Sequence, residues 1–414
     1  MNSQQIIQTL KNAIIGGDIP AMIDNFMRLS LKERASDIHI EPRKNSTHLR
    51  IRIDGTLREI IEYPLNMHPG VVSKLKLMSN LRIDESRIPQ DGRINTWVDE
   101  REIDLRVSTL PTPNGEKIVM RVLDKSKKIP DLTELGIVGT NLEKFMTSIS
   151  QPNGVILTTG PTGSGKTTTM YSALSRLNKT DVNILTLEDP IENQMEGLNQ
   201  SQTHNDIGYT FATGLRTALR QDPDIIMVGE IRDKETIDIA IEASLTGHLV
   251  LSTIHTNSAV DTIVRILNMK VPDFLLTASV NMIIAQRLVR KLCTNCREKQ
   301  TMSAGAQTKI KEAFAVFKPY EGLDMNIFAN PVIYGAKDGG CEACNNTGFN
   351  GRVGIFEIMI MTESIKNAIL KGLPSYEIEK VAKQEGMITL EQDGLIKVLE
   401  GKTSLQEVYK IIKK

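Results

Sequence analysis

The chain has 414 residues, enough for two or three domains and a sizeable buried core. Its 50 Lys and Arg residues balance 50 Asp and Glu residues, so the formal net charge is zero. This balance argues against a protein whose main affinity is for nucleic-acid phosphates, because such proteins usually carry a basic excess. An apolar fraction of 40% and a charged fraction of 24% do not fit extended disorder, collagen or a disulfide scaffold. No apolar run reaches the roughly 18–20 residues of a membrane helix, and the polar N-terminus lacks the layout of a secretory signal, so we expect a cytosolic protein.

The first part of the chain predicts an α+β domain. Its first 30 residues carry apolar side chains at helical spacing, and Gly16-Gly17 ends the pattern. An Asp54-Gly55 turn joins two alternating segments into a hairpin. The expected elements are strands over Leu49–Ile53 and Thr56–Ile61, a helix over Val71–Leu81, and strands over Ile94–Val98, Ile103–Val107 and Lys117–Leu123, with Pro111 and Pro113 interrupting. The charged stretch 124–133 is interpreted as an interdomain linker.

From Glu134 onward, short apolar segments alternate with helical patterns. Continuous apolar strands between helices predict a parallel sheet with both faces covered. The strands are expected at Val155–Thr159, Asn183–Leu187, Ile225–Val228 and Leu249–Thr253. After Lys291 the sequence is punctuated by Gly and Cys, and Glu363–Lys414 is expected to form polar helices. The predicted fold class is therefore α/β, with a smaller α+β domain in front of it.

A complete phosphate-loop motif, G-x-x-x-x-G-K-[ST], follows the first of these strands and precedes an expected helix at Thr168–Leu177. Its glycines let backbone N–H groups converge on phosphate oxygens, and the helix N-terminus favours negative charge. We expect Lys166 to reach the β- and γ-phosphates and the Thr167 hydroxyl to bind Mg²⁺. A plain glycine-rich turn is the alternative. The motif consists of Gly160, Pro161, Thr162, Gly163, Ser164, Gly165, Lys166 and Thr167.

Two acidic residues follow strands that should border this loop. Glu188 comes directly after Asn183–Leu187, and the carboxyl ends of parallel strands face the ligand crevice of an open α/β sheet. Glu230 follows Ile225–Val228 in a Walker-B arrangement, whose carboxylate binds Mg²⁺ through water or polarises the attacking water. For Glu188, a solvated group of loop charges is the alternative.

Two histidines bracket the next strand, with His248 before it and His255 after it. A polar group at this strand end is a candidate sensor of the γ-phosphate that reports to a neighbouring subunit. The alternative is that both imidazoles only satisfy local hydrogen bonds.

All four cysteines fall into two C-x-x-C pairs, Cys293/Cys296 and Cys341/Cys344. In a cytosolic chain such paired knuckles predict a tetrahedral Cys₄ zinc site. The long gap between the pairs indicates that the metal holds an inserted subdomain together and carries out no chemistry. Reduced thiols and a redox dithiol are the alternatives.

Taken together, these motifs resemble the secretion-motor ATPases of bacterial type II secretion and type IV pilus assembly. The similarity runs from about Ala35 to the C-terminus. The paired cysteines favour the extension or secretion branch over the pilus-retraction branch, which usually lacks them. Further stretches that carry the resemblance are Arg34–Pro42, Pro89–Arg93, Arg106–Pro111, Gly214–Asp224 and Ala285–Arg290.

The resemblance implies a RecA-like P-loop motor domain behind a PAS-like N-terminal domain, working as a homohexamer with ATP, Mg²⁺ and Zn²⁺. It implies ATP hydrolysis that drives pilin or pseudopilin polymerisation through an inner-membrane platform protein, with the chain cytoplasmic and peripheral at the inner face of that membrane. Arg93 and Arg106 match arginines that this family brings to the γ-phosphate, where guanidinium groups neutralise developing charge. Solvated strand arginines are the alternative. The residues carried over as catalytic by motif are Glu188, Glu230, His248 and His255.

The pattern and the resemblance together predict six parts. They are a helical segment 1–30, a PAS-like α+β domain 31–123, a linker 124–133, a RecA-like core 134–290, a Cys₄ zinc subdomain 291–355 and a C-terminal helical region 356–414. Many relatives carry an additional N-terminal domain that docks on a membrane partner. In this chain, either the Met1–Ile15 helix or a different surface is expected to dock on the platform protein.

Two other functions are compatible with a phosphate loop. A RecA-like nucleic-acid translocase with a zinc ribbon is one, but zero net charge and an aromatic content of 4% weigh against it. A non-catalytic, nucleotide-gated scaffold is the other, and the intact Lys166, Thr167 and Glu230 argue against that. We therefore expect no nucleic-acid partner and no transmembrane segment.

Overall fold

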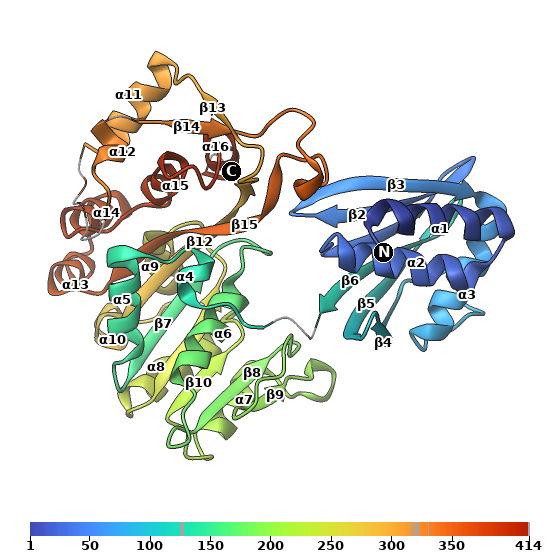
Figure 1. Cartoon of the computed structure of the whole chain (residues 1–414). Helices are drawn as coiled ribbons and strands as arrows, with labels where there is room; N and C mark the ends of the chain where they lie inside the picture. Colours follow the sequence, from blue (N-terminus) through green and yellow to red (C-terminus); the bar gives the residue numbers. More distant parts are fainter. Residues whose placement is uncertain (125–127, 316, 318, 320–322, 330, 413–414) are drawn as a thin grey trace. The chain divides into compact units, whose positions relative to one another are not determined.

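The computed structural model describes residues 1–124, 128–315, 317, 319, 323–329 and 331–412. The chain divides into two compact units, Met1–Lys128 and Ile129–Lys414 (Figure 1). Part of the predicted linker, residues 125–127, lies outside the described residues.

Unit 1 is an α+β unit in which helices pack against an antiparallel sheet (Figure 1). Within its described residues the sheet has six strands in the order β3-β2-β1-β6-β5-β4. The strands are β1 (Asp37–Pro42), β2 (Ser46–Ile53), β3 (Thr56–Pro64), β4 (Gln90–Val98), β5 (Arg101–Thr112) and β6 (Gly115–Asp124). The helices are α1 (Ser3–Gly16), α2 (Ile19–Lys32) and α3 (His68–Met78), with a 3-10 turn η1 at Leu65–Met67.

The core of unit 1 lies between helices and sheet because one side of each strand is apolar. In β1, alternating Ile38 and Ile40 are fully buried, and they belong to one cluster with Leu10 of α1 and Phe26 of α2. The predicted Asp54-Gly55 turn is confirmed: both residues have positive φ, 47° and 82°, as the tight hairpin between β2 and β3 requires.

Two expectations for unit 1 were wrong in detail. Helix α3 starts at His68 rather than Val71, because Pro69 fits the first turn of a helix, and it ends at Met78 rather than Leu81. Pro111 does not interrupt a strand but lies inside β5. Strand β4 begins opposite Thr109, so Pro111 lies beyond its end and its missing N–H costs no ladder hydrogen bond there.

Unit 2 is built on a mixed sheet in which, among the described residues, seven strands follow the order β15-β12-β7-β11-β10-β8-β9. The strands are β7 (Gly154–Thr159), β8 (Ile184–Glu188), β9 (Asn199–Gln202), β10 (Ile225–Val228), β11 (Leu249–Ile254), β12 (Val280–Leu292) and β15 (Phe349–Ile360). The four predicted strands are confirmed and are parallel. The expected parallel sheet is extended beyond these strands, and at one edge β15 pairs antiparallel with β12.

Helices cover both faces of this sheet, as predicted. Successive residues of β7 point to opposite sides: Val155 and Leu157 belong to one apolar cluster and Ile156 to another. One face carries α4 (Leu132–Leu135), α5 (Gly139–Ile149) and α6 (Lys166–Leu177). The other carries α7 (Phe211–Ala218), α8 (Lys234–Leu245), α9 (Ala259–Asn268), α10 (Asp273–Ser279), α13 (Glu363–Leu370) and α14 (Ser375–Gln384), with a 3-10 turn η2 at Asn205–Ile207 before α7.

The remaining elements include the second cysteine pair, and several of them pack in a smaller apolar cluster with the C-terminal helices α15 and α16. They are β13 (Glu298–Gln300), α11 (Ala304–Ala313), α12 (Asn326–Ala329), β14 (Ile333–Gly335), η3 (Glu342–Cys344), α15 (Leu390–Leu399) and α16 (Leu405–Ile412). The expectation of polar, solvated helices was wrong for α15, which is buried from Gln392 to Leu399. Its charged residues are accommodated because Lys397 pairs with Asp393, which also accepts a hydrogen bond of 2.7 Å from the Phe356 N–H. None of the helices in the described ranges is both long enough and apolar enough to span a membrane.

Candidate nucleotide site

The phosphate loop lies between the end of β7 and the start of α6, as its sequence predicts. Gly160, Gly163 and Gly165 all have positive φ, at 150°, 77° and 88°. A Cβ at Gly160 would lie 2.5 Å from the carbonyl oxygen of Gln286, so only glycine fits there. The Ser164 hydroxyl is buried and makes no hydrogen bond to any described residue. An unpartnered hydroxyl inside a glycine-rich turn at a helix N-terminus fits an anion-binding cradle.

Lys166 is the first residue of α6 and points back over the loop. Its ammonium donates to the carbonyls of Gly160 at 2.8 Å and Pro161 at 3.4 Å. Burial lowers the pKa of Lys166, and the charge of Glu230 acts in the opposite direction. A partly desolvated cation held by neutral carbonyls gains stability when an anion approaches it.

Glu230 stands where the sequence predicts, directly past the end of β10. Its carboxylate contacts the Arg232 guanidinium and lies 3.3 Å from Nε2 of His255. The hydrogen bond to Glu230 raises the pKa of Arg232. Gly229 lets the chain turn here, with its N–H donating to the Leu187 carbonyl at 2.7 Å. The carboxyl ends of β7, β10 and β11 thus bring Lys166, Glu230 and His255 to one edge of the sheet.

Glu188 lies at the same edge but is buried, so the solvated-loop interpretation of this residue was wrong. One carboxylate oxygen accepts the Tyr171 hydroxyl from α6. The other accepts Thr186 Oγ1 at 2.6 Å and Gln200 Nε2 at 3.0 Å. Burial and the neighbouring carboxylate raise the pKa of Tyr171, so its hydroxyl remains a donor. In this arrangement Glu188 ties α6 to β8 and β9.

His248 is not brought to the phosphate loop of its own chain. It precedes β11, and Leu249 pairs with Gly154 at the amino end of β7. The six residues of β11 lie between it and His255, so the two histidines are seven residue steps, or about 23 Å, apart at roughly 3.3 Å per residue. Its Nδ1 lies 2.9 Å from the Ala243 carbonyl, which fits the interpretation of a locally satisfied imidazole.

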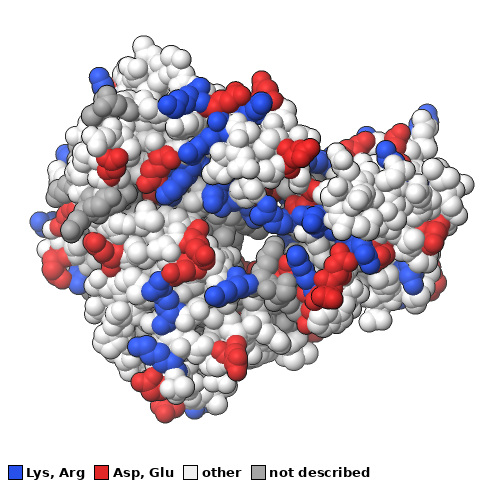
Figure 2. Space-filling model, viewed as in Figure 1, with Lys and Arg blue, Asp and Glu red and all other residues white. Residues whose placement is uncertain are grey.

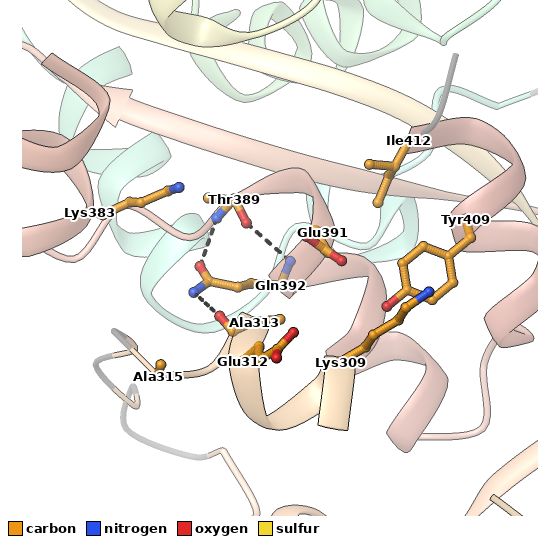
Figure 3. A pocket seen from close by; sticks show the side chains of 10 residues that line it. All are labelled: Lys309, Glu312, Ala313, Ala315, Lys383, Thr389, Glu391, Gln392, Tyr409 and Ile412. Carbon is orange, nitrogen blue, oxygen red and sulfur yellow. Dashed lines mark hydrogen bonds between the residues drawn. The ribbon is translucent and has the colours of Figure 1, made fainter. Parts of the chain in front are cut away.

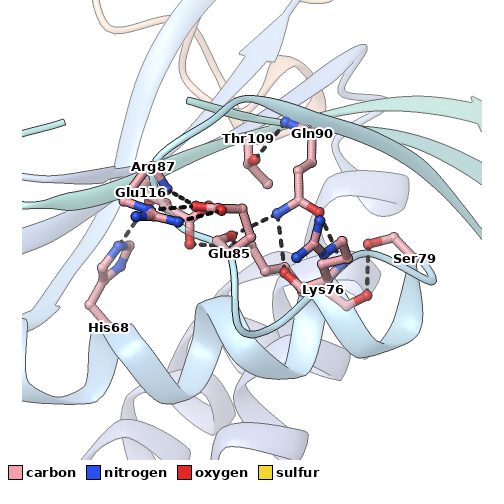
Figure 4. Close-up of polar contacts among 9 residues, drawn as sticks. His68, Lys76, Ser79, Glu85, Arg87, Gln90, Thr109 and Glu116 are labelled. Carbon is pink, nitrogen blue, oxygen red and sulfur yellow. Dashed lines mark hydrogen bonds and ion pairs between the residues drawn. The ribbon is translucent and has the colours of Figure 1, made fainter. Parts of the chain in front are cut away.

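Arg93 and Arg106 face each other in register on β4 and β5 of unit 1. Arg93 is exposed and Arg106 is half-buried. The start of β4 is anchored to β5 through Gln90, whose N–H donates to Thr109 Oγ1 at 3.1 Å (Figure 4).

A buried polar cluster fixes the loop that precedes β4 (Figure 4). The Lys76 ammonium of α3 donates to the Glu85 carbonyl at 2.7 Å and pairs with the Glu116 carboxylate at 2.6 Å. Gln90 Nε2 donates to the same Glu85 carbonyl at 2.8 Å. The strand that carries Arg93 is therefore held at its start by α3 and β6.

The four cysteine thiols converge as the C-x-x-C spacing predicts. All four sulfurs lie within 4.8 Å of one another, and the Cys293–Cys341 and Cys296–Cys344 separations are both 3.8 Å. Four sulfurs at about 2.3 Å from a central zinc stand about 3.8 Å apart in a tetrahedron, so the cluster has the dimensions of a Cys₄ zinc site. Burial opposes ionisation of Cys344, but N–H donors of Cys341 and Gly348 outweigh it and lower its pKa to about 6. Such donors suit a thiolate ligand.

A cavity of about 620 Å³ lies away from the phosphate loop, among α11, α14, α15 and α16 (Figure 3). Its wall contains two basic residues, Lys309 and Lys383, and two acidic ones, Glu312 and Glu391, so neither sign of charge predominates. Gln392 links α15 to the end of α11 through the Ala313 carbonyl at 2.8 Å.

Several residues at the nucleotide site were not singled out as site residues by sequence reasoning. Tyr171 and Arg232 contact the two acidic strand ends, and Gln286 and Arg287 border the loop itself. The stretch Ala285–Arg290 was noted only as part of a resemblance. The sequence does contain a pattern that could have indicated these two residues. An apolar run ends in Gln286-Arg287, just as the other strands end in polar residues at this edge of the sheet.

Comparisons with known proteins show the family of the chain. A family model described as type II/IV secretion system protein matches residues 16–410. The chain is 44% identical over 410 residues to the type IV pilus assembly ATPase PilB of Myxococcus xanthus (strain DK1622), covering 97% of this chain and 69% of that one. It is 44% identical over 392 residues to type II secretion system protein E of Dickeya dadantii (strain 3937), covering 95% and 75%.

Two solved structures share the fold. One is the pilus retraction motor PilT with bound ADP, at 25% identity and a TM-score of 0.60, covering 94% of this chain and 96% of that one. The ATPase DotB of Legionella pneumophila, at 20% identity and a TM-score of 0.68 over 95% and 96% of the two chains, supports the fold alone. The resemblance predicted from the motifs is thereby confirmed, and the chain belongs to the type II/IV secretion system protein family.

Proposed function

We propose that this chain is a Mg²⁺-dependent ATPase that powers type IV pilus assembly or type II protein secretion. The observation that carries the proposal is that the phosphate loop with Lys166, after β7, and Glu230, after β10, lie at the same edge of the sheet, close enough for the charge of Glu230 to act on the pKa of Lys166. The names of the relatives, a pilus assembly ATPase and a type II secretion protein E, support the choice of process.

The proposed roles follow from position and chemistry. Lys166 and the loop N–H groups bind the phosphates of ATP, and the Thr167 hydroxyl holds Mg²⁺. Bound Mg-ATP supplies the phosphoryl group that is transferred to water. Glu230 orients and polarises that water molecule, and His255 and Arg232 hold its carboxylate in place. Lys166 and Thr167 begin α6, whereas Glu230 and His255 follow strands β10 and β11, so secondary structure positions all four.

The other predicted site residues take different parts. Arg93 and Arg106 are proposed to neutralise charge on the γ-phosphate. Glu188 acts as a buried support that fixes α6, and His248 does not enter the phosphate site of its own chain. The Cys₄ cluster holds Zn²⁺ as a structural metal.

We further propose that the chain works as a homohexamer on an inner-membrane platform protein, at the cytoplasmic face of that membrane. The six-part division given above is part of this proposal. The boundary between the two compact units, at Lys128 and Ile129, falls inside the proposed linker 124–133 and supports that part of it.

The decisive experiment compares ATP turnover of the wild type with Lys166→Ala and Glu230→Gln. We expect Glu230→Gln to bind nucleotide and to lose at least about 100-fold in kcat, because it retains the shape but not the basicity of the side chain. Lys166→Ala should lose nucleotide binding as well. Glu242→Gln, at an exposed position on α8, is the matched control and should behave as the wild type. Turnover at the wild-type rate in both site variants would contradict the proposed mechanism.

The same assay tests the alternative function, a nucleic-acid translocase. Figure 2 shows acidic side chains among basic ones over the visible face of both units, which does not favour a phosphate-backbone track. We expect ATP turnover to be unchanged by added single- or double-stranded DNA. A strong stimulation would favour the translocase instead.

A further inference from the structure

Strand β12 forms a wall of the phosphate loop. It runs parallel to β7 up to the pair Ala285 and Thr159, and then continues beside the loop where β7 has already ended. The next residue, Gln286, presents its carbonyl oxygen 2.5 Å from the position that a Cβ would take at Gly160. The first glycine of the motif is thus required by the close approach of this second strand.

The Gln286 side chain reaches the other end of the loop. It is almost fully buried, and its Oε1 accepts a hydrogen bond of 2.8 Å from the hydroxyl of Thr169 in the first turn of α6. Its Nε2 lies 2.9 Å from where a Cβ would stand at Gly165, the last glycine of the motif. One residue therefore lies against Gly160 and Gly165, two of the three motif glycines, and bonds to the helix that carries Lys166.

Arg287 extends the same contact to the strand end that carries His255. Its buried guanidinium donates to the Gln286 carbonyl at 3.0 Å and to the Asn257 carbonyl at 2.8 Å. Asn257 is two residues from His255, whose imidazole lies 3.3 Å from the Glu230 carboxylate. Burial lowers the pKa of Arg287 while the carboxylate of Glu357 opposes this, and the Arg287 charge itself contributes to the lowered pKa of Lys166. Two buried cations beside one loop favour a multiply charged anion there.

We propose that Gln286 and Arg287 are positioning residues for the triphosphate of the nucleotide. Gln286 sets the phosphate loop through Thr169 and the two glycines, and Arg287 fixes the segment from Asn257 to His255 relative to that loop. The inference rests on the proposed ATPase function for its turnover readout, whereas its binding readout requires nucleotide binding alone.

The test for Gln286 is a double-mutant cycle with Gln286→Met and Thr169→Val, measured by ADP affinity and by KM and kcat for ATP. Both changes keep side-chain volume nearly constant and remove one hydrogen-bond partner. We expect each single variant to weaken ADP binding and raise KM by about 3- to 10-fold, with a smaller change in kcat. The double variant should be no weaker than the worse single one, because both remove the same hydrogen bond.

Two further variants keep the result interpretable if a single change unfolds the protein. Thr169→Ser retains the hydroxyl and should bind ADP as the wild type does. Ser175→Ala, at an exposed position on the same helix, is the matched control. Strictly additive losses in the cycle, or wild-type affinity in Gln286→Met, would overturn the role of Gln286.

Arg287→Gln tests the proposed role of Arg287 when the effects on KM and on kcat are measured separately. The loss of the tether to Asn257 should lower kcat by about 10-fold or more while ADP affinity changes less, because the His255–Glu230 contact becomes misaligned. An unchanged kcat would overturn the role of Arg287. A wild-type chain that binds ADP but never hydrolyses ATP would refute the proposed function, and the ADP-binding cycle would still decide the role of Gln286.

Discussion

At the scale of single residues, the environment of a carboxylate decides what it can do. Glu188 and Glu230 both follow a parallel strand, and their sequence contexts look alike. In the structure, Glu230 is half-buried beside His255 and Arg232, whereas Glu188 is buried and both of its oxygens accept hydrogen bonds from the protein. The position of a carboxylate at a strand end could be predicted from the sequence. The occupancy of its oxygens could not, because the Gln200 donor comes from β9, outside the motif.

Glu41 in β1 gives a pH-dependent prediction for unit 1. Burial opposes its ionisation, but contacts with Arg50 at 2.6 Å and Lys117 at 2.9 Å outweigh burial and lower the pKa of Glu41 to about 2. Because the folded-state pKa lies below the ordinary value, this carboxylate stabilises the fold above about pH 4.5, and the contribution is lost as the pH falls towards 2.

Denaturant unfolding of Glu41→Gln and the wild type checks this from pH 7 down to pH 3. We expect the wild type to be more stable at pH 7 and the difference to shrink at the acidic end. Glu100→Gln, in the exposed turn between β4 and β5, should show no such difference. A stability gap that stays constant or grows towards pH 3 would contradict the assignment.

At the scale of elements, strands with a clear apolar pattern could be predicted from the sequence, but strands that join the sheet through long-range pairing could not. The four strands β7, β8, β10 and β11 are short, apolar and bounded by helices, so their existence and their parallel direction could be expected. Strands β12 and β15 were missed because β15 comes more than 50 residues after β12 in sequence, and charged residues such as Arg287 and Arg290 interrupt the apolar pattern of β12. The antiparallel edge of the sheet is a product of this long-range pairing.

The helix α15 lies within the expected helical stretch Glu363–Lys414, but its burial was not expected. Its Asp393 and Lys397 are charged and one turn apart, which in sequence is typical of an exposed helix. In the structure they pair with each other inside the core, where Asp393 also binds the β15 backbone.

The cysteine knuckles lead to a prediction at the same scale. The Arg297 guanidinium, next to Cys296, donates to the Gly401 carbonyl at 2.5 Å, and the N–H of Leu292, next to Cys293, donates to the Lys402 carbonyl at 2.9 Å. The residues that flank the first cysteine pair are therefore hydrogen-bonded to the turn between α15 and α16. Cys344→Ser should remove the metal and lower Tm by at least about 5 °C, because structural zinc contributes directly to folding.

Metal analysis and thermal unfolding together test this. The wild type should contain about one zinc ion per chain, and Thr294→Ser, between the first two cysteines, should keep both the metal and the wild-type Tm. A metal-free wild type that unfolds at the same temperature as the loaded protein would refute a structural zinc site.

At the scale of the whole molecule, the zero net charge matters less than the distribution of the charged residues between the two units. Arg93 and Arg106 belong to unit 1, and Lys166 and Glu230 belong to unit 2. Charges that are spread over both units and balanced overall leave no large single-sign field to collect a polyanion, so binding of phosphate depends on bringing a few groups together.

This division predicts that assembly controls activity. If Arg93 and Arg106 act on the γ-phosphate as proposed and the chain works as a homohexamer, a monomeric chain should hydrolyse ATP slowly. In the assembled fraction the specific activity should rise by about 100-fold or more, because one positioned charge contributes at least about that much to phosphoryl transfer. Sizing-column fractions assayed at equal chain concentration measure this directly. Arg106→Ala should abolish the gain in the assembled fraction while leaving the assembly itself intact, and Arg121→Ala, on the adjacent strand β6, provides the matched control. Equal specific activity in monomeric and assembled fractions would show that each chain carries a complete site by itself.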